Sequence, residues 1–86
     1  MLSVFARPKP CRIMILLRDN ETQWHLSKIA KNSDTTYVYV TGLIRKLEKA
    51  GFLTIEPKGK KRIVKLTEKG IKVANTINEL ENVLEN

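Results

Sequence analysis

Four cationic side chains lie within five consecutive residues, in the segment Lys-Gly-Lys-Lys-Arg at positions 58–62. Ammonium and guanidinium groups at this density can neutralise the phosphates of a nucleic acid and release their condensed counterions. The glycine suits a tight turn, because it adopts backbone conformations that other residues avoid. Strand-like runs at positions 52–56 and 63–66 flank the segment, so we predict a β-hairpin with a basic, phosphate-contacting tip.

A second group of candidate binding residues follows from the periodicity of residues 36–50. Apolar residues recur there at i, i+3, i+4 and i+7, which predicts a helix with one inward stripe: Val40, Leu43, Ile44 and Leu47. The opposite face presents hydroxyl, phenol, glycine and basic positions that can reach base edges or phosphates. With the turn before the helix and the hairpin tip, the predicted DNA-binding residues are Thr35, Thr36, Tyr37, Tyr39, Thr41, Gly42, Arg45, Lys46, Lys58, Lys60, Lys61 and Arg62.

These residues have different expected roles. Arg45 can fork onto a guanine or clasp a phosphate, and threonine methyl groups can touch thymine methyls. Gly42 costs its helix about 1 kcal/mol relative to alanine, so we expect a compensating close approach to a groove wall. Tyr37 and Tyr39 point about 200° apart on a helix, so at most one of them belongs to the core.

A helix-turn-helix should hold the helix of residues 36–50 in place. Leu26, Ile29 and Ala30 share one face of a short preceding helix, and residues 32–35 form a turn rich in capping side chains. Such a pair places its second helix in the major groove of DNA. Residues 22–24 could pair as one short strand.

Apolar patterns near both ends of the chain predict that the protein forms a dimer. Pro8 and Pro10 suit a helix start, and residues 12–18 read as a helix that is apolar on every side, although a strand competes for so short a run. We expect this segment to contact its own core and a second subunit. After the N-cap candidate Thr67, apolar residues recur at spacings of 4, 3 and 4 like a coiled-coil seam, unless this helix folds back onto its own core. The predicted dimer interface is Ile13, Leu17, Val73, Ile77, Leu80 and Leu84.

Composition narrows the class of protein. The 86 residues suit one small domain of marginal stability, and the formal charge of +7 points to an anionic partner, a nucleic acid rather than a membrane. All 16 basic residues lie in residues 1–72, which carry a net +10, whereas residues 73–86 are acidic. The apolar start is too short for a membrane span, so we expect a cytoplasmic, nucleoid-associated protein.

Catalytic and metal-binding patterns are missing from the sequence. It contains no Ser-His-acid set, no phosphate-cradling glycine loop and no carboxylate pair with a plausible pocket, so we expect neither an enzyme nor a cofactor. His25 and Cys11 are single representatives of their types and cannot build a metal site alone. Cys11 is expected to be a buried, inert thiol; a bridge between two copies of Cys11 is the alternative.

Three stretches of sequence resemble MarR-type winged helix-turn-helix proteins, and small archaeal dimers of this kind in particular. They are Leu-Ser-Lys-Ile-Ala from Leu26, Val-Thr-Gly-Leu-Ile-Arg-Lys-Leu-Glu-Lys-Ala-Gly-Phe-Leu from Val40, and Leu-Thr-Glu-Lys-Gly from Leu66. The resemblance covers residues 10–72. It implies a homodimer whose recognition helices enter successive major grooves and whose hairpins, the wings, lie along the minor groove. Ser33 and Thr35 stand where the family usually has apolar residues. The chain is also shorter than full MarR-type regulators, so a small-molecule effector is not expected.

The sequence therefore predicts a mainly α fold with a small β-hairpin (α+β), a winged helix-turn-helix with a long C-terminal dimerisation helix. Residues 1–86 form one domain, with a DNA-binding module at 10–70 and a dimerisation helix at 67–86. The favoured function is a homodimeric regulator of transcription, a repressor, that binds double-stranded DNA. An architectural DNA-coating protein and a protein-contact subunit of a larger assembly remain as alternatives.

Overall fold

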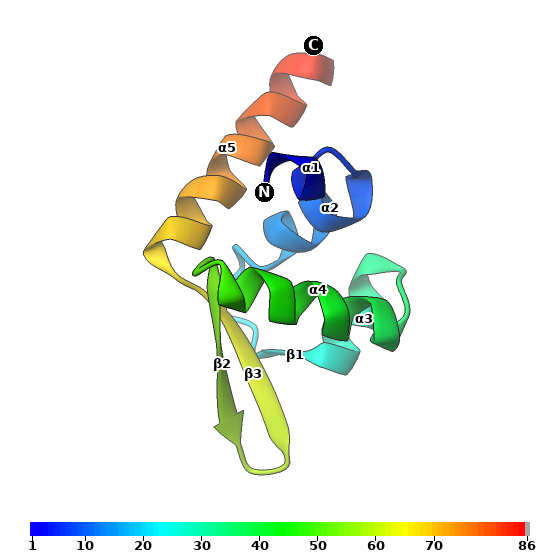
Figure 1. Cartoon of the computed structure of the whole chain (residues 1–86), viewed down its shortest axis with the longest axis vertical. Helices are drawn as coiled ribbons and strands as arrows, with labels where there is room; N and C mark the ends of the chain where they lie inside the picture. Colours follow the sequence, from blue (N-terminus) through cyan, green and yellow to red (C-terminus); the bar gives the residue numbers. More distant parts are fainter. Residues whose placement is uncertain (86) are drawn as a thin grey trace.

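Five helices surround one end of a small sheet in residues 1–85, the part of the chain that the computed structural model describes. The hairpin extends away from the helices on one side, and the last helix projects on the other (Figure 1). This arrangement confirms the predicted mainly α fold with a helix-turn-helix followed by a hairpin. The elements in chain order are α1 (Leu2–Phe5), α2 (Pro8–Leu16), β1 (Trp24–His25), α3 (Leu26–Ser33), α4 (Tyr37–Lys49), β2 (Leu53–Lys58), β3 (Lys61–Leu66) and α5 (Glu68–Glu85).

The sheet has the antiparallel order β1-β3-β2, so β3 lies in the middle. Trp24 is opposite Val64 in the β1–β3 pair, and Lys58 is opposite Lys61 next to the hairpin turn. The turn itself holds only Gly59 and Lys60, and Gly59 has the positive φ of 62° that favours glycine. The hairpin is thus longer than predicted, and three of its four cationic residues lie on strands rather than in a loop.

The core lies between the helix-turn-helix, the base of the hairpin and the first turns of α5. Its largest fully buried side chains include Ile13, Met14, Ile29, Ile44 and Leu47. Helix α2 packs against α3 on one side and α5 on the other. Both helices that pack against α2 belong to the same chain.

This packing corrects part of the predicted dimer interface. Ile13 is 0% exposed and Leu17 is 4% exposed within a single chain, so neither side chain has surface left for a partner. The all-round apolar character of residues 12–18 is explained by α5, which covers the face that we had assigned to a second subunit.

The N-terminal residues are more ordered than their sequence suggested. Residues 2–5 form the short helix α1, which was not predicted, and α2 begins at Pro8 instead of residue 12. Phe5 packs edge-on against Phe52, with ring centroids 5.8 Å apart, and this contact holds α1 on the core.

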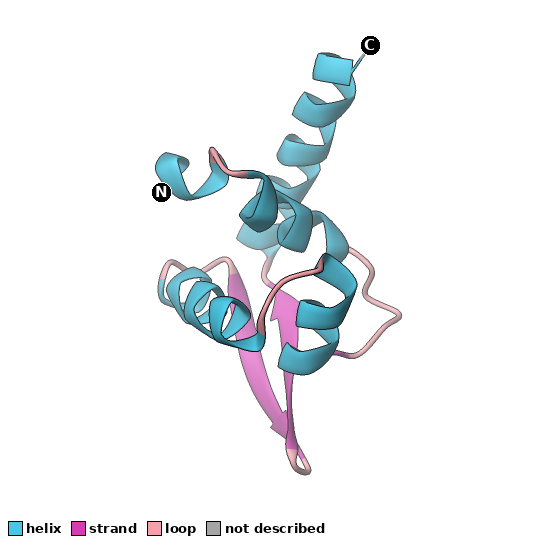
Figure 2. Ribbon diagram, turned by 90° about the vertical axis from the view of Figure 1, so that its right-hand side faces the viewer, coloured by secondary structure: helices cyan, strands magenta, loops and turns pink. Residues whose placement is uncertain are grey.

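Helix α5 is anchored at its start and free at its end. The Thr67 hydroxyl accepts a hydrogen bond from Gly70 N (3.1 Å) and donates one to Gly51 O (2.7 Å), which confirms Thr67 as the N-cap. Ala74 is fully buried, whereas the last turns extend beyond the other helices (Figure 2). The first turns of α5 therefore pack on the core, whereas its last turns are not covered by other elements of the chain.

Candidate nucleic-acid interface

The inward stripe of α4 determines which of its residues face solvent. Val40, Ile44 and Leu47 are 0% exposed, and Leu43 is 7% exposed, as the periodicity predicted. The helix ends at Lys49 and is followed by the C-cap Ala50 and by Gly51, whose φ is 85°. Phe52 N donates to Leu47 O (3.0 Å), and Gly51 N donates to Glu48 O (3.0 Å). This pair of bonds is a Schellman motif, and it leads the chain directly into the hairpin.

The start of α4 is fixed by polar side chains in the helix-turn-helix. Thr36 is the N-cap, and its hydroxyl accepts a hydrogen bond from Tyr39 N (3.1 Å). Ser33 is buried, but its hydroxyl donates to Ile29 O (2.6 Å) and pairs with the Thr35 hydroxyl (2.8 Å). These bonds explain how the turn tolerates two polar residues where apolar ones were expected. They also engage Thr35, a predicted DNA contact, in holding the turn.

The exposed side of α4 presents most of its predicted contacts. Tyr37 is 53% exposed, and Gly42, Arg45 and Lys46 are exposed. The Thr41 hydroxyl donates to Tyr37 O (2.8 Å), which leaves its methyl group and lone pairs for a ligand. Tyr39 differs from Tyr37, because its ring is half-buried against the core.

Sequence reasoning missed Val38, which is 81% exposed on this side of α4. An apolar side chain held in water on a helix face is suited to contact a thymine methyl group. The signal was present in the periodicity, since Val38 lies opposite the buried stripe. It was overlooked because an apolar residue offers no hydrogen bond.

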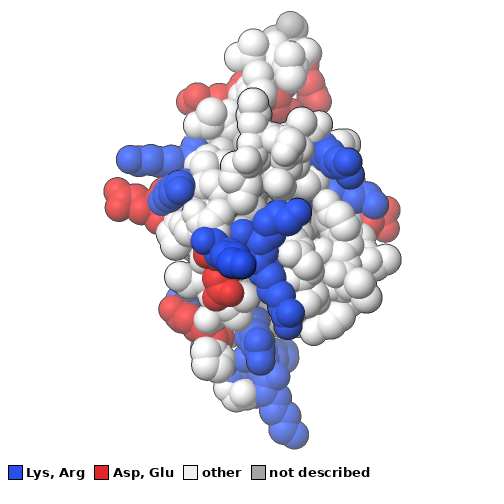
Figure 3. Space-filling view, viewed as in Figure 1, with Lys and Arg blue, Asp and Glu red and all other residues white. Residues whose placement is uncertain are grey.

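Helix α4 and the hairpin share a surface. Tyr37, Thr41 and Arg45 of α4 line one hollow together with Arg62 of β3. A second hollow continues from Tyr37 and Arg62 to Lys60 and Lys61 at the hairpin end. In Figure 3, Lys and Arg atoms run from the middle of the face down onto the hairpin, with a few acidic atoms beside them and others near the α5 end. The structure therefore places the basic hairpin and the outward side of α4 next to each other.

His25 lies at the edge of the second hollow, between the hairpin and α3. Its Nδ1 atom accepts a hydrogen bond from Lys28 N (3.3 Å) and so caps α3. Loss of solvation, then the charges of Lys61 and Lys28, lower the pKa of His25 below its ordinary 6.5. The imidazole is thus neutral at pH 7 and serves as a helix cap.

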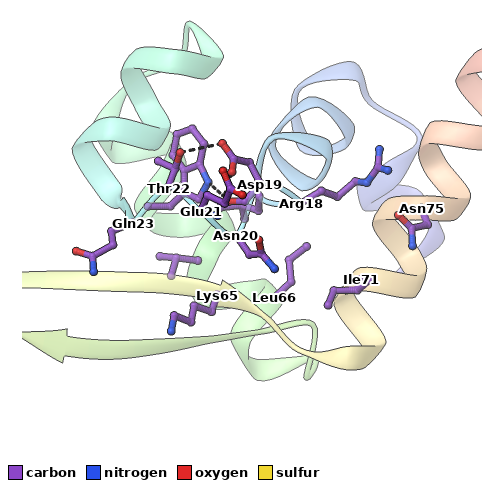
Figure 4. A pocket seen from close by; sticks show the side chains of 13 residues that line it. Arg18, Asp19, Asn20, Glu21, Thr22, Gln23, Lys65, Leu66, Ile71 and Asn75 are labelled. Atoms are coloured by element: carbon purple, nitrogen blue, oxygen red, sulfur yellow. Dashed lines mark hydrogen bonds between the residues drawn. The ribbon is translucent and has the colours of Figure 1, made fainter.

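A polar hollow on another side of the molecule lies between residues 17–24, β3 and α5 (Figure 4). The Asp19 carboxylate accepts hydrogen bonds from Glu21 N (3.1 Å) and from the Thr22 hydroxyl (2.8 Å). These bonds lower the pKa of Asp19, the hydroxyl being the larger cause. Trp24 Nε1 donates to the carbonyl of Asp19 (2.9 Å), so the loop's polar groups serve to hold the loop itself.

The predicted α5 seam divides into two parts. Val73 and Ile77 are half-buried against the core of their own chain. Leu80 is 57% exposed, Leu84 is 73% exposed, and the adjacent Val83 is 70% exposed. An apolar groove between α5 and α1 begins at Leu80 and includes the half-buried Cys11.

Cys11 is held by its surroundings. Its Sγ donates a hydrogen bond to Phe5 O (2.9 Å). Burial, then the charge of Glu81, raise the pKa of Cys11, which favours the protonated thiol and an inert role.

Residues 1–85 hold neither a metal-ligand cluster nor a membrane-spanning helix. This part of the chain brings no three His, Cys, Asp or Glu side chains together as metal ligands. None of its helices combines the length and the apolar character that crossing a bilayer requires.

Comparisons with known proteins find a family model and several relatives. Residues 12–78 match the family described as DUF6293 C-terminal winged helix domain. An uncharacterized protein of Archaeoglobus fulgidus is 32% identical over 62 residues, which span 72% of this chain and 65% of that protein.

Three solved structures share the fold. AF1382 from Archaeoglobus fulgidus has a TM-score of 0.85 at 27% identity, over 91% of this chain and 89% of that one. Sso10a-2, a DNA-binding protein from Sulfolobus solfataricus, has a TM-score of 0.76 at 25% identity, over 93% and 84%. The MarR family transcriptional regulator SPO1453 from Silicibacter pomeroyi has a TM-score of 0.78 at 23% identity, over 92% and 57%. The winged helix fold and the likeness to MarR-type and archaeal proteins are thereby confirmed.

Proposed function

This chain belongs to the family of DUF6293 C-terminal winged helix domains, and we propose that it is a homodimeric transcription regulator, a repressor, that binds double-stranded DNA. The observation that carries the proposal is the surface shared by α4 and the hairpin, where Arg45 and Arg62 line one hollow. Residues 10–70 form the DNA-binding module of a single domain. This role places the protein in the cytoplasm, associated with the nucleoid.

Two elements contact DNA in this proposal. Helix α4 enters the major groove, where Arg45, Thr41 and Val38 reach base edges. The wing, hairpin β2–β3, lies along the backbone and the minor groove with Lys58, Lys60, Lys61 and Arg62. The nearby Sso10a-2 structure, named as a DNA-binding protein, supports the choice of ligand.

Dimerisation is supported by the apolar end of α5. Leu80, Val83 and Leu84 are all more than half exposed, and monomeric proteins rarely leave such a cluster in water. We propose that α5 is the dimerisation helix and that its far end packs against a second copy; the last residue of the predicted range 67–86 lies outside the described residues. Two recognition helices would then reach half-sites about one helical turn of DNA apart.

The wing is tested by the salt dependence of binding. Each phosphate contact contributes about −0.9 to the slope of log affinity against log salt. Replacing the four wing cations by alanine should therefore flatten the slope and weaken binding to all duplexes alike, as measured by fluorescence anisotropy. Arg18→Ala, which removes one charge at the far end of α2, is the control. A stripped wing that binds with the original affinity and slope would contradict the proposal.

An architectural role remains the second candidate, because the exposed side of α4 presents Val38 and Gly42 where charges could stand. Selection of bound fragments from a random DNA pool separates the two functions. A regulator should prefer its selected site over random duplex by a factor on the order of 10³ or more. A coating protein should show no such gap, and a protein-contact subunit should bind no duplex at moderate salt.

A further inference from the structure

A groove runs along the side of α4 that faces away from the wing. The N-terminal segment forms one wall with Val4, Arg7 and Pro10, and α4 forms the other with Val38, Gly42 and Lys46. Figure 1 shows the same arrangement in outline, with α1 and α2 on one side of α4 and the hairpin on the other. Helix α4 therefore has a hollow along each flank.

The groove has a basic rim. Arg7 and Lys46 are its basic lining residues, both are exposed, and no Asp or Glu side chain lines it. A third cation stands nearby, because Lys9 Nζ lies 5.4 Å from the ring centroid of Tyr39, another residue of the groove. An anion entering here would meet positive charge from both walls.

The floor of the groove is open at Gly42. A Cβ atom built there would have no neighbour within 4 Å, so nothing in the chain requires glycine at this position. Glycine inside a helix nevertheless costs about 1 kcal/mol relative to alanine. A ligand backbone that approaches α4 closely at this point would account for the absent side chain.

Arg7 is presented by a fixed segment. The residue has extended dihedral angles (φ −114°, ψ 146°), as the following Pro8 favours, and it is the N-cap position of α2. The preceding α1 is tied down by the contact between Phe5 and Phe52 and by the hydrogen bond from Cys11 to Phe5 O. The backbone that carries Arg7 therefore has little conformational entropy left to lose when the side chain binds an anion.

We infer that this groove holds the sugar–phosphate backbone of DNA beside the major groove that α4 occupies. The inference rests on the proposed function and adds a contact to it. The wing binds backbone on one flank of α4, and the N-terminal segment binds backbone on the other through Arg7 and Lys46. Such contacts position the recognition helix and carry no sequence information of their own.

The test compares single charge removals at the two ends of α2. Arg7→Ala should lower the salt slope for duplex binding by about 0.9 for each subunit, or about 1.8 for a bound dimer, and Arg7→Lys, which keeps the charge, should restore it. Affinity for a selected site and for random duplex should fall by the same factor. Arg18→Ala is the matched control, and circular dichroism confirms that each variant is folded.

The outcomes separate the two proposals. If the wild-type protein binds duplex and Arg7→Ala changes the slope no more than Arg18→Ala does, the groove contact is wrong while the proposed function stands. If the wild-type protein binds no duplex, the proposed function fails and the inference fails with it.

Discussion

Replacing each of the two helical glycines, Gly42 and Gly70, by alanine should change the free energy of unfolding in opposite directions. A Cβ at Gly42 meets nothing within 4 Å, so Gly42→Ala should gain the helix-propensity difference of about 0.5–1 kcal/mol. A Cβ at Gly70 would overlap the backbone carbonyl of Phe52 and lie 3.2 Å from the Leu66 side chain. Because that carbonyl also accepts the Thr67 N–H (3.0 Å), it cannot move freely, and Gly70→Ala should cost on the order of 1–3 kcal/mol.

Thermal unfolding followed by circular dichroism measures this contrast. A change of 1 kcal/mol shifts the midpoint of a domain this size by about 4–8 °C, so the two variants should lie clearly on either side of the wild type. The protein concentration must be the same throughout, because dimerisation also stabilises the fold. Destabilisation by Gly42→Ala would refute the reading of Gly42 as unconstrained by its own chain.

DNA binding supplies the second half of the prediction. If a DNA backbone approaches α4 at Gly42, the added methyl group should cost on the order of 1 kcal/mol, or about five-fold in Kd. Gly42→Ala would then be more stable and a weaker binder. A stabilised variant with unchanged affinity would show that no ligand comes close to this position.

Three further predictions concern stability and assembly. The folded-state pKa of His25 lies below 6.5, so its contribution to the free energy of unfolding should be present above that pH and decline as pH falls toward 5. Urea titrations across this range should show the decline, and His25→Asn, which replaces the capping Nδ1 atom by a side-chain oxygen that does not titrate, should remove it. Ser33→Ala should cost about 1 kcal/mol in the same assay, because it removes the buried bond to Ile29 O and leaves the Thr35 hydroxyl without that partner. Leu80→Glu should shift sedimentation from dimer to monomer, whereas Asn82→Glu, about 200° around the helix, should not.

Local pattern predicted the elements of the interface well. Three predicted features depend on residues close together in sequence, and all three are present in the structure. They are the buried stripe Val40–Leu43–Ile44–Leu47, the glycine Gly51 after the end of α4, and the N-cap Thr67. The hairpin was predicted from its turn and flanking strands, although it proved longer, because Lys58 and Lys61 complete the ladder next to a two-residue turn.

Partners that are distant in sequence were harder to predict. Residues 12–18 were predicted to contact a second subunit. Their apolar side chains show that both faces of the helix are buried, but they do not show which element covers each face. Ile13 and Leu17 are buried in the core of their own chain, with α5 covering α2. The groove at Gly42 could not be predicted from the sequence either. Arg7 and Lys46 are 39 positions apart in the chain, and they line the same groove only because α1 packs on the core.

The sequence by itself determined the order of the helices and strands that follow α1, the inward face of α4 and the placement of charge toward the hairpin. These features follow from side-chain periodicity, capping and turn chemistry, which act over a few residues. Only the tertiary structure decided that the wing and the N-terminal segment lie on opposite flanks of α4, and that α5 rather than a second subunit covers α2. Those outcomes depend on which apolar faces pack together, and periodicity identifies a buried face without identifying its partner.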